Sequence, residues 1–253
     1  MNDDEMEKLF FSLASKSRLD ILHCLSVDKL RMIEIARKVD ITPTEASRQI
    51  QRLRDERIIR KHNDDRYSLT HYGELVMHFF PGLRFVSKYK QYFMAHDVWK
   101  LPRQFVSRLG ELSQGNLSTE LAETVNGIEN LINSSDDHVW VITNQGMAVH
   151  TIAMAERISK GVKFRSLVPE NVVGSSQIKI FGKNVERRIL SSIPGLFSIS
   201  EKEAFVSLLS MEGKVDGFGF FGKDTSFMKW ANDFFLYYWE QTDRRYPKIN
   251  SNL

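Results

Sequence analysis

The chain has 253 residues, of which 42% are hydrophobic and 26% are charged, and its formal net charge at pH 7 is +3. This composition excludes a disordered chain, and the length fits two domains of ordinary size. The sequence contains no run of about 18 apolar residues, which excludes a membrane-spanning helix. Its acidic first residues lack the positive charge of a secretory signal, so we expect a cytoplasmic protein.

The first segment, residues 3–27, places apolar side chains at helical spacing with a break near Ser15–Ser17. This pattern predicts two short helices. A third helix is predicted over Leu30–Val39. Its inward-facing apolar residues are expected to be Ile33, Ile35 and Ala36.

The next helix, over residues 43–57, has the clearest start in the chain. Thr42 is the expected N-cap, Pro43 occupies the first helical position, and Glu45 completes a capping box. At about 100° per residue, the face that packs inward consists of Ala46, Ile50 and Leu53. The opposite face is polar and bears two arginines; it consists of Thr44, Ser47, Arg48, Gln51 and Arg52.

A β-hairpin is predicted after this helix, because two short strand-like runs flank the turn-forming residues 63–65. Thr70 then caps a helix that runs to about Phe80, and Pro81 with Gly82 is expected to end it. A further helix is predicted from Leu83 to about His96, with apolar residues at spacings of three and four.

The second half of the chain mixes helix and strand signals. A helical pattern covers residues 102–132, and a strand (139–142), a helix (145–160) and a strand (162–168) predict a βαβ unit with parallel strands. Strands are also predicted at 196–200, 203–210 and 215–221, the last two forming a hairpin. A final helix over 224–242 carries one aromatic face, expected in the core: Phe227, Trp230, Phe234 and Tyr238.

These elements predict a mixed α+β protein. Its amino-terminal part has the order of a winged helix-turn-helix, and its carboxy-terminal part is an α/β domain with a βαβ unit and a β-hairpin. The expected organisation is a DNA-binding domain (1–82), a linker and dimerisation helix (83–99), an effector domain (100–246) and a tail (247–253).

The amino-terminal part resembles the ArsR-like winged-helix family in the segments Leu19–Leu22, Ile33–Val39, Ala46–Leu53 and Tyr67–Thr70. The carboxy-terminal part resembles the effector domain of archaeal winged-helix regulators of the methanogenesis-regulator type. That likeness is carried by Val139–Thr143, Ile199–Val206, Gly213–Phe218 and Trp230–Trp239. Together the two resemblances imply a transcription regulator that binds double-stranded DNA and responds to a ligand or signal through its second domain.

The polar helix face is then the expected reader of the DNA major groove. Arg48 and Arg52 are expected at base edges or phosphates, with Thr44, Ser47 and Gln51 beside them. On the wing, Arg60, Lys61 and Arg66 are expected to contact phosphates or enter the minor groove. The alternative is a set of solvated surface charges, since acidic residues lie among them: Asp55, Glu56, Asp64 and Asp65.

Regulators of this class dock two modules on a palindromic site, with half-sites ~34–36 Å apart, so we expect a homodimer. The expected interface consists of exposed apolar residues on the helices after the hairpin: Phe79, Phe80, Val86, Tyr89 and Phe93. The alternative is that these side chains pack on their own domains. An anionic small-molecule effector is expected at a helix start after a strand, formed by Thr143, Asn144 and Gln145, where the alternative is a plain N-cap.

No metal or cofactor is expected. Many ArsR-type proteins sense metals through paired cysteines, whereas Cys24 is the only cysteine here and lies in an apolar stripe. His71 and His78 share a helical face but lack further ligands at a convincing spacing, as does His62.

An enzyme of the phospholipase D type would place a lysine two residues after His150, where Ile152 stands. We therefore expect a binding protein and not an enzyme. The remaining alternative is a winged-helix module that binds RNA or a protein partner instead of an operator.

Overall fold

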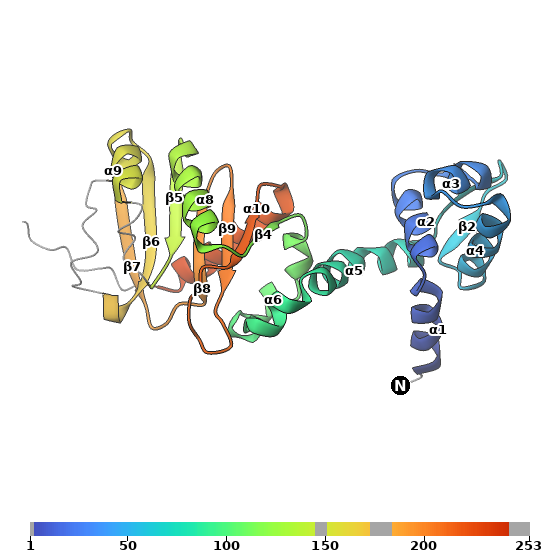
Figure 1. Cartoon of the computed structure of the whole chain (residues 1–253), viewed down its shortest axis with the longest axis horizontal. Coiled ribbons are helices and arrows are strands. Elements are labelled where there is room, and N and C mark those ends of the chain that lie inside the picture. The colour runs from blue at the N-terminus through green and yellow to red at the C-terminus, as the bar shows by residue number, and fades with distance from the viewer. Residues whose placement is uncertain (1–2, 145–150, 173–183, 243–253) are drawn as a thin grey trace, which may run out of the picture. The chain divides into compact units, whose positions relative to one another are not determined.

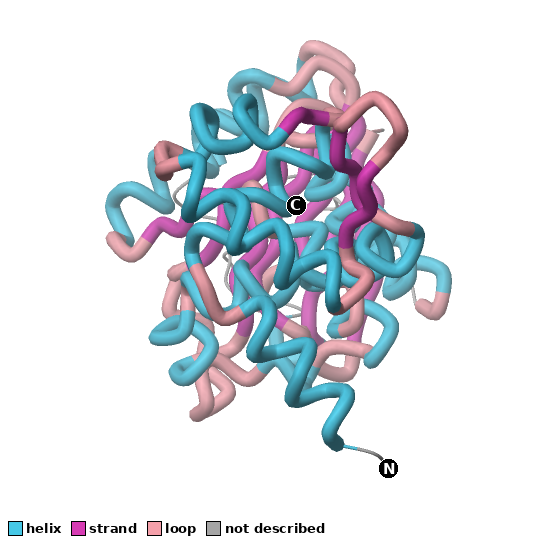
Figure 2. The backbone as a smooth tube through the Cα atoms, turned by 90° about the vertical axis from the view of Figure 1, so that its right-hand side faces the viewer, coloured by secondary structure: helices cyan, strands magenta, loops and turns pink. Residues whose placement is uncertain are grey.

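The computed structural model describes residues 3–144, 151–172 and 184–242. It divides into two compact units, Met1–Pro81 and Gly82–Leu253 (Figure 1). Both units combine helices and strands, which Figure 2 separates by colour. The mixed α+β class predicted from the sequence is confirmed.

The first unit consists of short helices and a small sheet. In chain order its elements are α1 (Asp3–Leu13), α2 (Lys16–Val27), β1 (Leu30–Arg31), α3 (Met32–Val39), α4 (Pro43–Asp55), β2 (Ile59–Lys61), β3 (Arg66–Leu69) and the first half of α5 (His71–Lys88). Its core is largely aliphatic, with Ile21, Leu22, Ile35 and Leu53 fully buried.

The sheet of this unit has the strand order β1-β3-β2, and both pairings are antiparallel. The hairpin β2–β3 turns through residues 62–65, where Asp65 adopts a positive φ of 62°. Thr70 caps α5 as predicted, because its hydroxyl accepts a hydrogen bond from the Gly73 amide at 3.0 Å. A Cβ on Gly73 would lie 2.1 Å from the Ile58 carbonyl oxygen, so the hairpin approaches α5 at a point that only glycine permits.

The second unit is built on one seven-stranded sheet of order β4-β10-β9-β8-β5-β6-β7. Its strands are β4 (Asn116–Ser118), β5 (His138–Ile142), β6 (Lys163–Pro169), β7 (Val185–Leu190), β8 (Gly195–Ser200), β9 (Ala204–Leu208) and β10 (Gly219–Gly222). Its helices include α6 (Lys90–Ala95), α7 (Arg103–Val106), α8 (Leu121–Ser134), α9 (Thr151–Ser159) and α10 (Thr225–Glu240), with short 3-10 turns at Val98–Lys100, Leu109–Leu112 and Glu170–Val172.

Helices cover both faces of this sheet. The side chains of α10 pack with Phe197, Ile199 and Val206 on one face, whereas those of α8 and α9 pack with Val139, Val141 and Phe205 on the other. All five residues of β9 are therefore buried. The parallel pairing of β5 with β6, with α9 between them in the chain, is the predicted βαβ unit.

Several sequence-based boundaries are wrong. Leu30 and Arg31 form β1, since Leu30 pairs with Tyr67, and Ile33 faces solvent with 45% of its surface exposed. The helical pattern over 102–132 is interrupted by β4, which pairs with β10 about a hundred residues away. The strand predicted at 215 begins at Gly219, because Gly217 takes a positive φ of 83°. The strand β7 carried no clear alternation and was not predicted.

Pro81 does not end a helix, contrary to the prediction. The helix α5 continues through it to Lys88, losing the one hydrogen bond that proline cannot donate. Apolar packing holds the helix on both sides of this position: Phe80 packs on the core of the first unit and Phe85, 1% exposed, on that of the second. Of the helix predicted over 145–160, residues 151–160 fall within the described residues, and Thr151–Ser159 are helical.

Candidate nucleic-acid interface

The helix α4 begins where the sequence placed it. A three-residue turn, Asp40–Thr42, joins α3 to α4, and Asp40 ends α3 in the left-handed conformation with φ 56°. The Thr42 hydroxyl accepts a hydrogen bond from the Glu45 amide at 3.2 Å, and Pro43 starts the helix. The second half of the predicted capping box is wrong, because the Glu45 carboxylate accepts hydrogen bonds from the side chains of Arg48 and Gln49.

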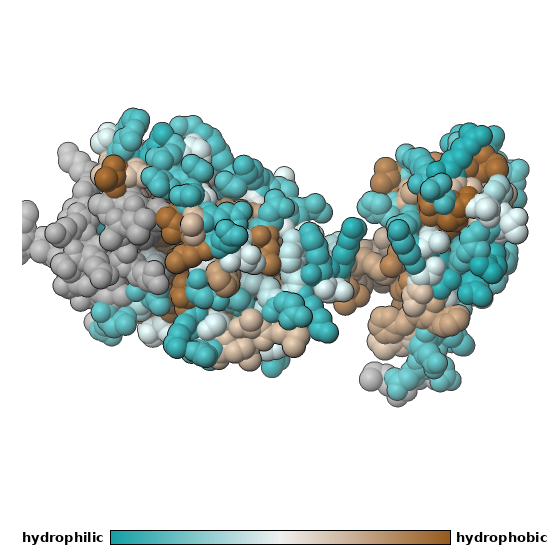
Figure 3. Space-filling model, viewed as in Figure 1, coloured by the Kyte–Doolittle hydropathy of each residue, from teal (hydrophilic) through white to brown (hydrophobic). Residues whose placement is uncertain are grey.

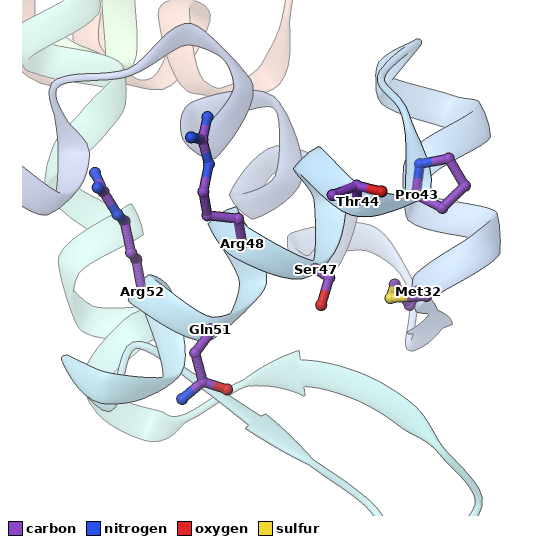
Figure 4. Close-up of a pocket in the computed structure, with 7 residues that line it drawn as sticks. All are labelled: Met32, Pro43, Thr44, Ser47, Arg48, Gln51 and Arg52. Carbon is purple, nitrogen blue, oxygen red and sulfur yellow. The ribbon is translucent and has the colours of Figure 1, made fainter.

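One face of α4 is buried and the other is open to solvent. Ala46 and Leu53 are fully buried and Ile50 is 2% exposed, as the helical spacing predicted. The five predicted contact residues are all exposed: Thr44, Ser47, Arg48, Gln51 and Arg52. With Met32 and Pro43 they line a shallow, open depression, and in Figure 4 Arg48 and Arg52 extend to one side of α4 while Ser47 and Gln51 lie on the other.

A buried polar network packs against the inner face of this helix, and no sequence pattern predicts it. Arg18 on α2 is only 4% exposed, and its guanidinium donates to Gln49 Oε1 at 2.7 Å and to the Phe11 carbonyl at 2.8 Å. Burial lowers the pKa of Arg18, and the positive charge of Arg52 lowers it further. Gln49 in turn donates to Glu45, so one chain of hydrogen bonds links α2 to the start of α4.

The exposed polar side chains of α4 differ in the ion pairs and hydrogen bonds that they form. Arg48 forms an ion pair with Glu45 one turn earlier, and Gln51 donates to Asp55 at 2.6 Å. Arg52 has neither an ion pair nor a hydrogen bond to any side chain among the described residues. The hydrogen bond from Gln49, followed by the charge of Arg48, lowers the pKa of Glu45, which is therefore ionised at neutral pH.

The hairpin carries the other three predicted contact residues, Arg60, Lys61 and Arg66, all exposed. Lys61 pairs with Asp65 at 2.5 Å and Arg66 lies 3.6 Å from Asp64. The hydrogen bond between Lys61 and Asp65 raises the pKa of the lysine and lowers that of the aspartate. The acidic residues of the turn thus offset part of the positive charge of the hairpin. This is what the alternative, a set of solvated surface charges, predicts.

Of the predicted effector residues, Thr143 and Asn144 lie within the described part of the chain. Thr143 is buried directly after β5, and its amide donates to the Leu167 carbonyl at 3.1 Å. The Oδ1 atom of Asn144 is buried without a hydrogen-bond partner among the described residues. Gln145 and the helix start expected after it lie outside them, so both the anion site and the N-cap stay predictions.

The five predicted dimerisation residues are not alike. Phe79 is 63% exposed and Val86 is 41% exposed. Phe80 packs partly against the core of the first unit, and Tyr89 and Phe93 pack partly against the core of the second, where the Tyr89 hydroxyl lies 3.3 Å from the Gly115 carbonyl. The expectation that all five are exposed is therefore wrong for these three. Hydrophobic side chains do reach the surface of the first unit (Figure 3), including Phe10, Phe11 and Leu75.

Within the described residues, no three His, Cys, Asp or Glu side chains gather as a metal site requires. His71 contacts only Glu74, at 3.2 Å, and His78 packs edge-on against Phe79. No described helix is long and apolar enough to cross a membrane.

Residues 6–87 match the family model described as the HVO_A0261 N-terminal domain, a segment that contains α2–α4 and the hairpin. No curated protein matches the chain. Among solved structures, the chain is similar to TrmBL2, described as an archaeal chromatin protein with a novel mode of DNA binding. The two are 14% identical, with 96% of this chain and 100% of that chain covered and a TM-score of 0.44.

Two further similar structures cover about half of this chain. NucT from Helicobacter pylori is 16% identical over 51% of this chain and 97% of its own, with a TM-score of 0.40. The phospholipase D family member Nuc from Salmonella typhimurium is 14% identical over 53% of this chain and 96% of its own, with a TM-score of 0.36.

Proposed function

We propose that the first unit is a winged helix that binds double-stranded DNA, and that the chain is a DNA-binding transcription regulator. One observation carries the proposal: α4 follows α3 after a three-residue turn, buries one face completely, and leaves Arg48 and Arg52 exposed on the other. In this reading α4 is the recognition helix and the hairpin β2–β3 is the wing.

The chemistry of the exposed face suits a major groove. The groove admits one α-helix, and its base edges present hydrogen-bond patterns that arginine, glutamine and serine side chains distinguish. Arg48 and Arg52 are the proposed contacts to guanine edges or adjacent phosphates, with Thr44, Ser47 and Gln51 beside them. On the wing, Arg60, Lys61 and Arg66 are the proposed phosphate contacts.

Arg52 gives the sharpest test of this assignment, because no described side chain holds it away from the DNA. Arg52→Ala is expected to weaken binding to a duplex selected from genomic fragments by ~1–3 kcal/mol, the scale of one base contact. The matched control is Arg37→Ala, an exposed arginine on α3 outside the depression, which should weaken binding to all duplexes slightly and equally. Fluorescence anisotropy at fixed salt measures both.

Equal losses for Arg52→Ala and Arg37→Ala would contradict recognition through this face. Single-stranded RNA that binds as tightly as the duplex, or a chain that shows no salt-dependent duplex binding, would favour the alternative module for RNA or a protein partner.

We also propose a homodimer on a palindromic site, supported by the apolar side chains that α5 leaves in solvent. Phe79→Glu is expected to convert the dimer to a monomer in light scattering, since it places a charge in an apolar interface. Met94→Glu is the control, because Met94 on α6 is 64% exposed, close to the 63% of Phe79. A wild-type chain that is monomeric at micromolar concentration removes the dimer.

The second unit is the proposed ligand-responsive part of the regulator, acting by binding and not by catalysis. Its sheet has a separate hydrophobic core on each face, covered by helices, a scaffold that holds ligand sites at strand ends. Hydrolysis of a phosphodiester substrate by the purified chain would overturn the non-enzymatic part of the proposal.

A further inference from the structure

The second unit contains a cavity of about 540 Å³ that the function proposed above does not assign. It is lined by parts of the chain that lie far apart in sequence: the end of β7 and the segment after it, Lys100, the connection between β9 and β10, and the end of α10. This volume lies within the range of pockets that hold small ligands.

The cavity lies at the carboxyl end of the parallel strands. β5, β6 and β7 run in the same direction, and the chain passes from Leu190 at the end of β7 to Gly195 at the start of β8. Since β8 lies beyond β6 and β5 in the sheet, residues 191–194 must cross three strand spacings, about 14 Å. Five peptide steps reach about 17 Å when fully extended, so this segment is long enough to make the crossing.

The residues that line the cavity include one cation and several hydroxyl groups. Lys100 is exposed and forms no ion pair or hydrogen bond through its ammonium group with any side chain of the described residues. Ser191 and Ser192 are exposed on the crossing segment, and their hydroxyls are likewise without described partners. Burial, and the neighbouring Tyr237, raise the pKa of Tyr238 to about 12, so its hydroxyl stays neutral at physiological pH.

The cavity is also lined by apolar side chains. Ile189, Leu190 and Ile193 are 7–9% exposed, and Leu209 is 9% exposed. The chain at the end of α10 is held in place, because the Arg188 guanidinium donates to the Thr242 carbonyl at 2.9 Å and stacks over the Trp239 ring at 4.2 Å. The cavity therefore combines a rigid apolar wall with an uncompensated positive charge.

We propose that this cavity binds a small amphipathic anion, such as a carboxylate with a short hydrocarbon chain. The charged group lies against Lys100 and the serine hydroxyls, and the hydrocarbon chain lies along Ile193 and Leu209. This inference deepens the proposed ligand response by naming its site and ligand class, and so it rests on that part of the proposed function. It moves the site from the predicted Thr143–Gln145 turn to the end of β7.

Calorimetric titration of the full chain, without DNA, tests the proposal with octanoate as the probe and 1-octanol as its uncharged counterpart. Octanoate is expected to bind at a single site and at least about tenfold more tightly than octanol, because only the anion gains a charge-assisted hydrogen bond. Lys100→Gln should weaken octanoate binding about tenfold and leave octanol binding unchanged. Lys90→Gln, which removes another exposed lysine of the same unit, is the control.

A substitution that fills the cavity provides an independent test of the proposal. Ser192→Trp should abolish binding of both probes, with its circular dichroism spectrum showing that the unit is folded. The proposal is overturned if wild-type chain binds no octanoate, if octanol binds equally well, or if Lys100→Gln and Lys90→Gln behave alike. The titration contains no DNA and therefore tests ligand binding alone. A chain that fails to bind a duplex does not contradict a positive octanoate result, and a chain that fails to bind octanoate does not contradict the DNA-binding proposal.

Discussion

The two units of this chain are built on different kinds of core. In the first unit the fully buried residues are almost all aliphatic, with Tyr67 as the aromatic exception. In the second unit the core on the α10 face of the sheet contains many aromatic rings, and Trp230 stacks on Phe234 with ring centroids 5.0 Å apart. The small aliphatic core supports one exposed helix face, whereas the aromatic core fixes several distant segments around a cavity.

The same difference makes the units separately observable. All four tryptophans of the chain, Trp99, Trp140, Trp230 and Trp239, lie in the second unit. Tryptophan fluorescence therefore reports unfolding of the second unit, whereas the proposed duplex binding would report the state of the first.

Trp230→Ala should have the largest effect. The ring is fully buried, its Nε1 atom donates to the Phe105 carbonyl at 3.1 Å, and its loss is expected to cost about 3–5 kcal/mol. The urea midpoint followed by the remaining tryptophans should fall, with duplex affinity unchanged. A parallel fall in duplex affinity would show that the two units do not behave independently.

Arg18→Met should be nearly as costly in the first unit, by about 2–4 kcal/mol, because it removes charged hydrogen bonds and leaves Gln49 Oε1 unpaired in the interior. Far-UV circular dichroism should show the loss while tryptophan fluorescence keeps the wild-type midpoint. Arg37→Met, at an exposed position on α3, should change stability by less than about 0.5 kcal/mol. Equal effects of the two substitutions would refute the structural role of Arg18.

Arg48→Ala should leave both cores intact and weaken specific duplex binding by ~1–3 kcal/mol. Arg60→Ala on the hairpin should instead weaken binding to all sequences alike and reduce the salt slope by about one. A gel-shift titration in which Arg48→Ala retains wild-type affinity at fixed salt would reject the contact.

Glu45 should give the smallest effect, visible as a pH dependence. Its pKa in the folded chain lies below the unfolded value of about 4.3, so the ionised carboxylate stabilises the first unit above that pH. This contribution is lost as the pH falls through the lowered pKa. The difference in urea midpoint between wild type and Glu45→Gln should therefore shrink on acidification from about pH 6 to about pH 3. A constant difference over that range would contradict this origin.

Local signals were enough to predict the start and the faces of α4. Thr42, Pro43 and the spacing of Ala46, Ile50 and Leu53 act within a few residues, and side-chain direction on a helix follows from position alone. The contact between Arg18 and Gln49 joins residues 31 positions apart, so no periodic pattern encodes it. Tyr89 and Phe93 were expected at the surface, because the sequence does not tell which core an apolar helix face meets.

In the second unit, long-range pairing decided what could be predicted. The βαβ unit was recognised because its strands are near neighbours in sequence and continuously apolar. β4 and β7 were not predicted, because each is recognisable as a strand only from its pairing partner. The partner of β4 is β10, and the partner of β7 is β6. The cavity unites Lys100 with residues near position 190 and with Thr242, so it exists only once the sheet has formed.

The close approach of Gly73 to the Ile58 carbonyl has a consequence for how the hairpin could meet a duplex. A single methyl group at position 73 would overlap that oxygen at 2.1 Å and push the base of the hairpin away from α5. The spacing between α5 and the hairpin thus depends on the absence of a side chain at position 73, and Gly73→Ala would shift Arg60, Lys61 and Arg66 without altering any charge.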